Sequence, residues 1–335
     1  MARRTAVGII IAAVLGFFPV TAVFYLSAKV AYSGTAEPLH GFRLQFPVMG
    51  TVAGFTLYTA DRETFLTACR AGKNEFAEVV KIANLRDPAS ELSRLNASAA
   101  DRPFSCSREM WQLLLRAEKA WHDSNGSFDI TIKPLMDIWG FYRKQNRIPS
   151  DAETAQTRQR TGFDKLHFDR IEKTVKFTVP GMALDLGGIA KGYAVDRAAA
   201  AIEKCGVHCG VVDLGGNLKL LPQPPPGKKY YSIGIRNPAK RGELLPDALQ
   251  LPGGRAVATS GDYERFVTYN SIRYGHIIDP HTGKPQANPA VTVITASALD
   301  ADIFSTSAYL GKIPVAEKLK KLYPESEFHF FPAAN

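Results

Sequence analysis

Helix-like and strand-like segments follow one another in this chain without regular alternation, and this order constrains the fold more than any other sequence feature. Segments typical of helices cover residues 64–85, 108–122, 151–160, 189–204, 301–310 and 315–322, whereas most strand-like segments come after residue 205. A doubly wound parallel sheet needs a helix between successive strands. The sequence therefore predicts an α+β fold.

The N-terminus predicts export from the cytoplasm. Arg3 and Arg4 precede residues 6–28, which contain no charged residue. As a helix this stretch would span roughly 35 Å, enough to cross a bilayer. The positive charges before it predict an N-terminus inside and a body outside. A signal peptide cleaved after Ala36 and an uncleaved transmembrane anchor are both open, and the length of the stretch favours the anchor.

We therefore divide the chain into an export segment, residues 1–36, and one domain, residues 37–335. This domain is expected in the periplasm, held at the inner membrane by its N-terminal helix. The composition, 45% hydrophobic and 22% charged, excludes wholesale disorder. A net charge of +9 favours anionic ligands. A nucleic-acid partner is disfavoured, because the basic residues are scattered. Cys205 and Cys209 leave a disulfide and two free thiols equally open.

The segment 185–196 reads DLGGIAKGYAVD and suits an anion. A strand ends at Asp185, Gly187 and Gly188 turn the chain, and a helix begins near Ile189. Free N–H groups at a helix N-terminus attract phosphates, and Lys191 adds a full positive charge. A tight strand-to-helix turn with a solvent lysine would show the same pattern, so the motif alone does not decide between structure and function.

Three further clusters carry groups suited to chemistry. Thr259 and Ser260 stand beside a glycine, where a turn can touch a ligand. His276 leads an apolar pair at a strand edge and could exchange protons near neutral pH. Asp302 and Thr306 are four residues apart and so share one helix face, and their oxygens suit a hard cation such as Mg²⁺. Taken singly, core packing or helix capping explains the histidine and the helix pair better than function does.

Together and in order, these motifs resemble the ApbE family, the FAD:protein FMN transferases. The segments that carry the resemblance are 49–51, 90–96, 128–131 with 139–141, 185–196, 213–217, 259–265, 276–283, and 302–306 with Gly311. The resemblance implies a single two-lobed domain of the ApbE type, related to T-folds, with an FAD cleft between the lobes and a hydrophobic helix in front.

The family resemblance also implies an activity. It is Mg²⁺-dependent transfer of FMN from FAD to a threonine or serine hydroxyl of a target flavoprotein, forming a phosphoester and releasing AMP. The implied acceptor is a flavoprotein subunit of a membrane electron-transfer complex.

Site residues carry over by motif position. The metal would be held by the Gly188 carbonyl, Asp302 and Thr306, and His276 would activate the acceptor hydroxyl, so His276 and Asp302 are the expected catalytic residues. The residues expected to bind FAD are Met49, Arg86, Ser127, Phe128, Asp129, Asp185, Lys191, Thr259, Ser260, His276 and Ile278.

Two positions depart from the family pattern. Arg86 stands where an aromatic residue is common, although its flat guanidinium can stack on a ring, and Gly275 replaces the first histidine of a frequent pair. Two other functions stay open: a Mg²⁺-dependent FAD pyrophosphatase that yields FMN and AMP, and a non-catalytic FAD-binding accessory protein of a respiratory complex. The retained Asp302, Thr306 and His276 argue against the accessory protein.

Overall fold

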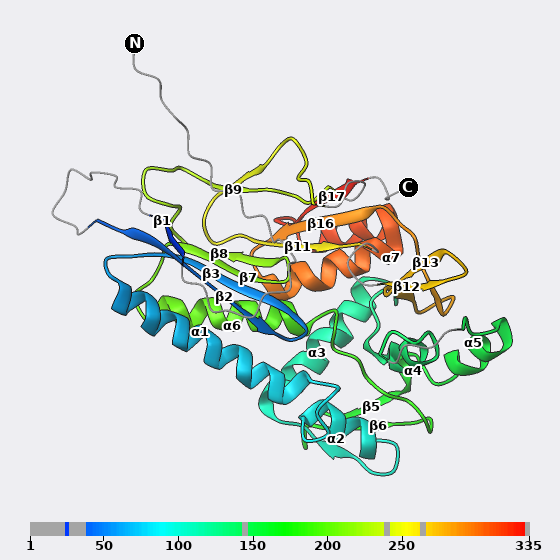
Figure 1. The fold of residues 1–335 in the computed structure, drawn as a ribbon. Helices are drawn as coiled ribbons and strands as arrows, with labels where there is room; N and C mark the ends of the chain where they lie inside the picture. The colour runs from blue at the N-terminus through cyan, green and yellow to red at the C-terminus, as the bar shows by residue number, and fades with distance from the viewer. Residues whose placement is uncertain (1–23, 27–37, 143–146, 238–241, 262–265, 332–335) are drawn as a thin grey trace.

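The computed structural model describes residues 24–26, 38–142, 147–237, 242–261 and 266–331. They are built around an eight-stranded sheet of order β1-β2-β3-β7-β8-β11-β16-β17 (Figure 1). Every neighbouring pair in it is antiparallel, which confirms an α+β fold rather than a doubly wound one. Its strands are β1 (Phe24–Leu26), β2 (His40–Val48), β3 (Thr51–Thr59), β7 (Gly210–Leu214), β8 (Asn217–Leu220), β11 (Ala256–Ser260), β16 (Ala290–Thr295) and β17 (Glu327–Phe331).

Two tight hairpin turns meet at one end of this sheet. Met49 and Gly50 join β2 to β3 with φ of 51° and 71°, and Gly215 and Gly216 join β7 to β8 with φ of 60° and 92°. Paired positive φ values match the right-handed twist of two-residue hairpins. Because β3 pairs with β7, the turns are neighbours, and the Gly215 N–H donates to the Val52 carbonyl (3.1 Å). The predicted bend at 49–51 and the predicted break at 215–216 are confirmed.

Three long helices cover one face of the sheet: α1 (Arg62–Ala83), α6 (Ala190–Lys204) and α7 (Ala298–Leu322) (Figure 1). The main core lies between them and the sheet and includes a stack of Phe55 on Phe76 with ring centroids 5.6 Å apart. Side chains alternate across a strand, so Val212 joins this core while its neighbour Val211 joins a smaller cluster with the β9–β10 hairpin. The strands of that hairpin are β9 (Tyr231–Ile233) and β10 (Leu249–Leu251).

The segment between α1 and α6 forms a second group of elements. It contains α2 (Glu91–Ser98), α3 (Arg108–Asp123), α4 (Lys133–Ile138), α5 (Asp151–Arg158), the 3₁₀ helices η1 (Ile130–Ile132) and η2 (Phe163–Lys165), and a sheet of order β4-β6-β5 made of Phe104–Ser105, Thr174–Phe177 and Leu166–Asp169. The predicted strand pair around residues 169–173 is therefore confirmed. Two small hairpins lie before β16: β12 (Phe266–Tyr269) with β13 (Ile272–Gly275), and β14 (Ile278–Asp279) with β15 (Lys284–Pro285).

The two predicted helices at residues 301–310 and 315–322 are confirmed. Both lie within α7, which consists of two helical parts separated by a non-helical break at Lys312 (φ 55°, ψ −151°) just before Pro314. Proline cannot donate a backbone hydrogen bond, which explains the break.

Of the predicted helix 6–28, only Phe24–Leu26 is described, and these residues form a strand that pairs with β2. The rest of that segment lies outside the described residues, so the anchor stays a prediction.

Within the described part of the chain, no helix is both long and apolar enough to span a membrane.

Cys205 and Cys209 are free thiols, so the disulfide alternative does not occur in this structure. Burial raises the pKa of the Cys209 thiol to about 12, which keeps it protonated and unreactive.

Candidate functional site

The turn into α6 is held from two sides. The Asp185 carboxylate is buried and accepts hydrogen bonds from the Gly187 N–H (2.7 Å) and from the Tyr142 hydroxyl. The Asn96 amide pairs with the Leu184 backbone, donating to the carbonyl (2.9 Å) and accepting from the N–H (2.7 Å). The N-cap residue of α6, Ile189, makes no side-chain cap hydrogen bond. The Ala190 N–H donates to the Leu186 carbonyl (2.8 Å), and the Tyr193 N–H donates to the Ile189 carbonyl (3.1 Å). The turn is thus held by its own backbone, and the positive end of the helix dipole behind it favours an anion.

Asp302 brings a carboxylate from α7 to the first turn of α6. It is only 4% exposed. Its Oδ1 accepts from Lys191 Nζ (3.1 Å) and from the Asn217 amide (3.3 Å), and its Oδ2 accepts from the Gly192 N–H (3.0 Å). A buried carboxylate needs such partners to stay ionised. Sequence motifs that lie far apart therefore meet at one acidic group.

Thr306 and Gly188 lie beside this carboxylate. Thr306 is one turn after Asp302 on α7, and its hydroxyl is 3.3 Å from that of Ser260, which also contacts Ser305 at 2.9 Å. A methyl group placed on Gly188 would be 3.6 Å from Thr306 Oγ1 and 3.1 Å from the Phe128 ring. The structure therefore gathers the three expected metal ligands, together with Ser260 and Phe128.

The donor set fits Mg²⁺. It offers one carboxylate, one hydroxyl and one backbone carbonyl, all oxygen atoms, and Mg²⁺ commonly uses few protein carboxylates together with substrate phosphates. No cluster of three or more His, Cys, Asp or Glu side chains suited to a metal occurs among the described residues. Oxygen donors such as these favour a hard cation over a soft transition metal.

A second buried carboxylate lies in the loop that packs on the glycine turn. Asp129 is 8% exposed and caps η1, accepting from the Thr131 N–H (2.8 Å) and hydroxyl (2.7 Å). Burial raises its pKa to about 6. The Asp185 N–H donates to the Ile130 carbonyl (2.7 Å), so this loop is joined directly to the turn. Ser127 is also buried and lies near Gly311 of α7.

Other predicted residues lie apart from this cluster or face elsewhere. The Thr259 hydroxyl contacts that of Thr292 (2.7 Å), and alternation along β11 places it on the opposite sheet face from Ser260. Arg86 is exposed in the turn after α1. Ile278 is buried in a cluster with α4. His276 is half-buried and connects β13 to β14.

Several residues that shape the site had no assigned role in the sequence analysis. Asn217 directly follows a Gly-Gly hairpin turn. Asn96 is the last residue of the motif 90–96. Two other residues of that motif are at helix starts: Ser90 caps α2, and Glu91 accepts hydrogen bonds from Ser107 at the start of α3. Their positions inside the motifs were the available clue. Nothing in the sequence around Tyr142 indicates its bond to Asp185.

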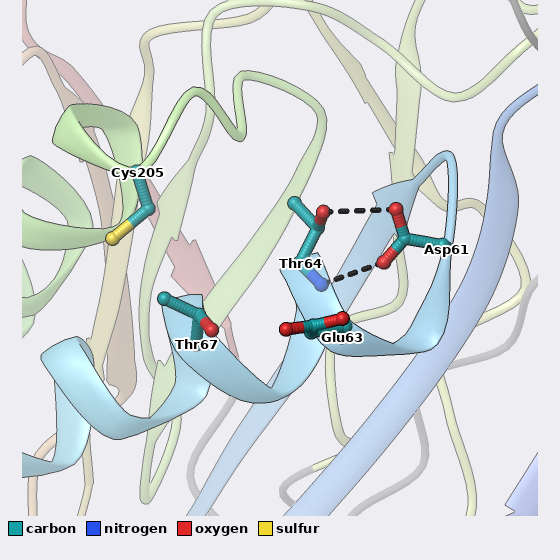
Figure 2. Close-up of a pocket in the computed structure, with 5 residues that line it drawn as sticks. All are labelled: Asp61, Glu63, Thr64, Thr67 and Cys205. Carbon is teal, nitrogen blue, oxygen red and sulfur yellow. Dashed lines mark hydrogen bonds between the residues drawn. The ribbon is translucent and has the colours of Figure 1, made fainter.

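A separate surface pocket lies between the start of α1 and the end of α6. It is lined by Asp61, Glu63, Thr64, Thr67 and Cys205 (Figure 2). Both carboxylate oxygens of Asp61 are engaged by Thr64, one by its N–H (2.7 Å) and one by its hydroxyl (3.1 Å). The acidic group is therefore used to cap α1, and the pocket contains none of the predicted site residues.

Comparison with known proteins gives one consistent result. The sequence model of the ApbE family matches residues 49–327. An FAD:protein FMN transferase of Vibrio cholerae is 30% identical over 289 residues, 84% of each chain, and one of Klebsiella pneumoniae is 32% identical over 65% of this chain and 67% of its own. The crystal structure of the ApbE protein of Thermotoga maritima superposes with a TM-score of 0.79 at 29% identity, covering 87% of this chain and 94% of that one. Flavin transferase ApbE from Vibrio cholerae gives 0.75 at 26% identity, over 88% and 98%.

Proposed function

The chain belongs to the ApbE family, and we propose that it transfers FMN from FAD to a threonine or serine hydroxyl of a target flavoprotein in a Mg²⁺-dependent reaction. It is an enzyme of the flavin transferase class, as its relatives across most of its length are. The observation that carries the finer proposal is the Asp302 carboxylate, which meets Lys191 and Gly192 at the start of α6. This arrangement suits a pyrophosphate with a bound cation.

In the proposed reaction the acceptor hydroxyl attacks the phosphorus of the FMN half. The new oxygen–phosphorus bond forms as the bond to the AMP oxygen breaks, and AMP leaves. His276 takes the hydroxyl proton as a general base, a role worth about 10²–10⁴-fold in rate. The Lys191 ammonium and the positive end of the α6 dipole stabilise charge on the phosphates.

The residues that would hold Mg²⁺ are Asp302, Thr306 and the Gly188 carbonyl. When bound, the ion would neutralise charge on the pyrophosphate oxygens. In this structure Lys191 already neutralises Asp302. The Lys191 side chain is 26% exposed, so it can turn from the carboxylate to a phosphate and leave the carboxylate oxygens open to a cation.

We propose further that the domain acts outside the inner membrane. The support is the uncharged stretch 6–28 behind Arg3 and Arg4. The acceptor in this setting is a flavoprotein subunit of a membrane electron-transfer complex.

The test is a transfer assay with purified protein, FAD, Mg²⁺ and candidate acceptor subunits. We expect an acceptor that fluoresces in the denaturing gel, with AMP released in equal amount, and loss of both signals with EDTA. An acceptor with valine in place of its target threonine is the control. His276→Ala should slow transfer by about 10²–10⁴-fold without abolishing it. AMP release with no fluorescent acceptor would indicate a pyrophosphatase, and FAD binding with neither product would indicate an accessory protein.

A further inference from the structure

Helices α6 and α7 touch at Gly192. A side chain placed there would have its Cβ 2.2 Å from the Ala298 carbonyl oxygen and 2.7 Å from Leu299 Cα. Only glycine permits such a close approach. The same residue donates its N–H to Asp302 Oδ2 (3.0 Å). The crossing of the two helices therefore fixes how the Asp302 carboxylate meets the start of α6.

One turn further along α6, Asp196 ties this crossing together. Its carboxylate accepts from the Ser297 hydroxyl (2.8 Å), the Ala298 N–H (2.9 Å) and the Leu299 N–H (2.9 Å). Ser297 is the N-cap of α7, so these are groups that the helix cannot satisfy internally. A charged acceptor at this helix start is also favoured by the helix dipole. A side chain of one helix thus completes the cap of the other.

The two tied helices carry opposite halves of the candidate metal and phosphate site. The start of α6 supplies Lys191 and Gly192 and follows Gly188, and α7 supplies Asp302 three residues after Leu299. We propose that Asp196 is a positioning residue that sets Asp302 against the start of α6 and thereby determines the affinity for the divalent cation. This inference rests on the proposed function, because the cation is the one expected at that site.

The test compares divalent-cation binding in Asp196→Asn and in the wild-type protein. The structure uses both carboxylate oxygens of Asp196, and asparagine offers only one acceptor oxygen. Mn²⁺ binding in the presence of FAD, followed by electron paramagnetic resonance, is the direct readout. Groups that orient metal ligands typically contribute 10–100-fold, so we expect the Kd for Mn²⁺ to rise by about that factor. FAD binding without metal, read by quenching of its fluorescence, should be nearly unchanged.

Asp61→Asn is the matched control. Asp61 caps α1 with the same carboxylate chemistry, and α1 supplies no candidate metal ligand. Asparagine caps a helix about as well as aspartate, so this variant should fold like the wild-type protein and leave Mn²⁺ affinity unchanged. Wild-type Mn²⁺ affinity in Asp196→Asn, or an equal loss in Asp61→Asn, would overturn the proposal.

Ser297→Ala covers the case in which Asp196→Asn does not fold. It removes the hydrogen bond that the Ser297 hydroxyl donates to Asp196 and the one that this hydroxyl accepts from the Asp300 N–H, and it leaves the two backbone N–H donors to Asp196 in place. A smaller loss of Mn²⁺ affinity, about threefold to tenfold, is expected for one hydrogen bond, and no loss would refute the positioning role. If Mn²⁺ affinity shifts but the wild-type protein transfers no FMN, the proposed function fails and the positioning role stands.

Discussion

Two buried aspartates near the glycine turn at 187–188, Asp302 and Asp129, have different hydrogen-bond partners. Asp302 is 4% exposed and Asp129 is 8% exposed. Asp302 faces an ammonium group and two N–H donors. Asp129 accepts from the N–H and hydroxyl of Thr131 and from the Phe163 N–H, and burial nevertheless raises its pKa to about 6. Similar burial thus accompanies two different tasks: one carboxylate pairs with the Lys191 ammonium, and the other caps a short helix.

The largest effect that separates the two aspartates is expected from Asp302→Asn. The amide keeps the size of the side chain but removes the charge that holds Lys191 and would hold the cation. Loss of one such electrostatic group typically costs about 10²–10³-fold in turnover. Initial rates of acceptor fluorescence, measured across a range of Mg²⁺ concentrations, check this expectation.

Asp300→Asn is the control on the same helix. Asp300 pairs with Arg116 of α3 (2.7 Å), so the variant also breaks a carboxylate–cation pair but faces away from the cluster. Its turnover per folded molecule should match that of the wild-type protein. A wild-type rate in Asp302→Asn would mean that the charge of Asp302 is not needed for transfer, and that Asp302 does not differ from Asp129 in this respect.

Asp129→Asn should reveal the opposite behaviour through the pH dependence of stability. Between pH 3.8 and about 6 the unfolded chain loses the Asp129 proton while the folded chain keeps it, so this group makes the wild-type protein less stable as pH rises through that window. Asparagine keeps an oxygen for Thr131 and carries no charge. The variant should therefore gain stability relative to the wild-type protein at pH 8, by up to roughly 3 kcal/mol, and little at pH 4.

Urea unfolding at the two pH values measures this difference. If Asp129→Asn differs from the wild-type protein by the same amount at both pH values, then Asp129 is not the buried, poorly compensated group that the structure indicates.

The same contrast explains how far the sequence could predict the site. The glycine turn and the Asp302–Thr306 spacing depend on residues close in the chain, and the structure confirms both of these local arrangements. Lys191 was expected to face phosphates, and in this structure it contacts Asp302, 111 residues away. Neither local pattern contains that pairing, because it is created by the crossing of α6 and α7.

Residues that support the site from a distance were harder to identify. Asn96 acts on Leu184, 88 residues away, and its motif looks like an ordinary helix. Thr259 illustrates the opposite difficulty. Its neighbour Ser260 faces α7, but alternation along the strand turns the Thr259 hydroxyl toward Thr292. A motif therefore indicates the right strand without showing which of its residues reach the ligand.

The smallest effect is expected from substitution of Asn217, one of the three hydrogen-bond donors to the Asp302 carboxylate. The Asn217 amide donates at 3.3 Å, the longest of the three donors, whereas the Gly192 N–H donates at 3.0 Å. Asn217→Ala should therefore weaken transfer by no more than about tenfold, the effect of one hydrogen bond, with Lys191 and Gly192 still holding the carboxylate. Asn217→Asp keeps the size but places a like charge beside Asp302, and it should lower both stability and Mg²⁺-dependent transfer further than alanine does. Equal effects of the two variants would mean that a charge at position 217 does not act on Asp302, and that the charge of Asp302 is balanced from α6 alone.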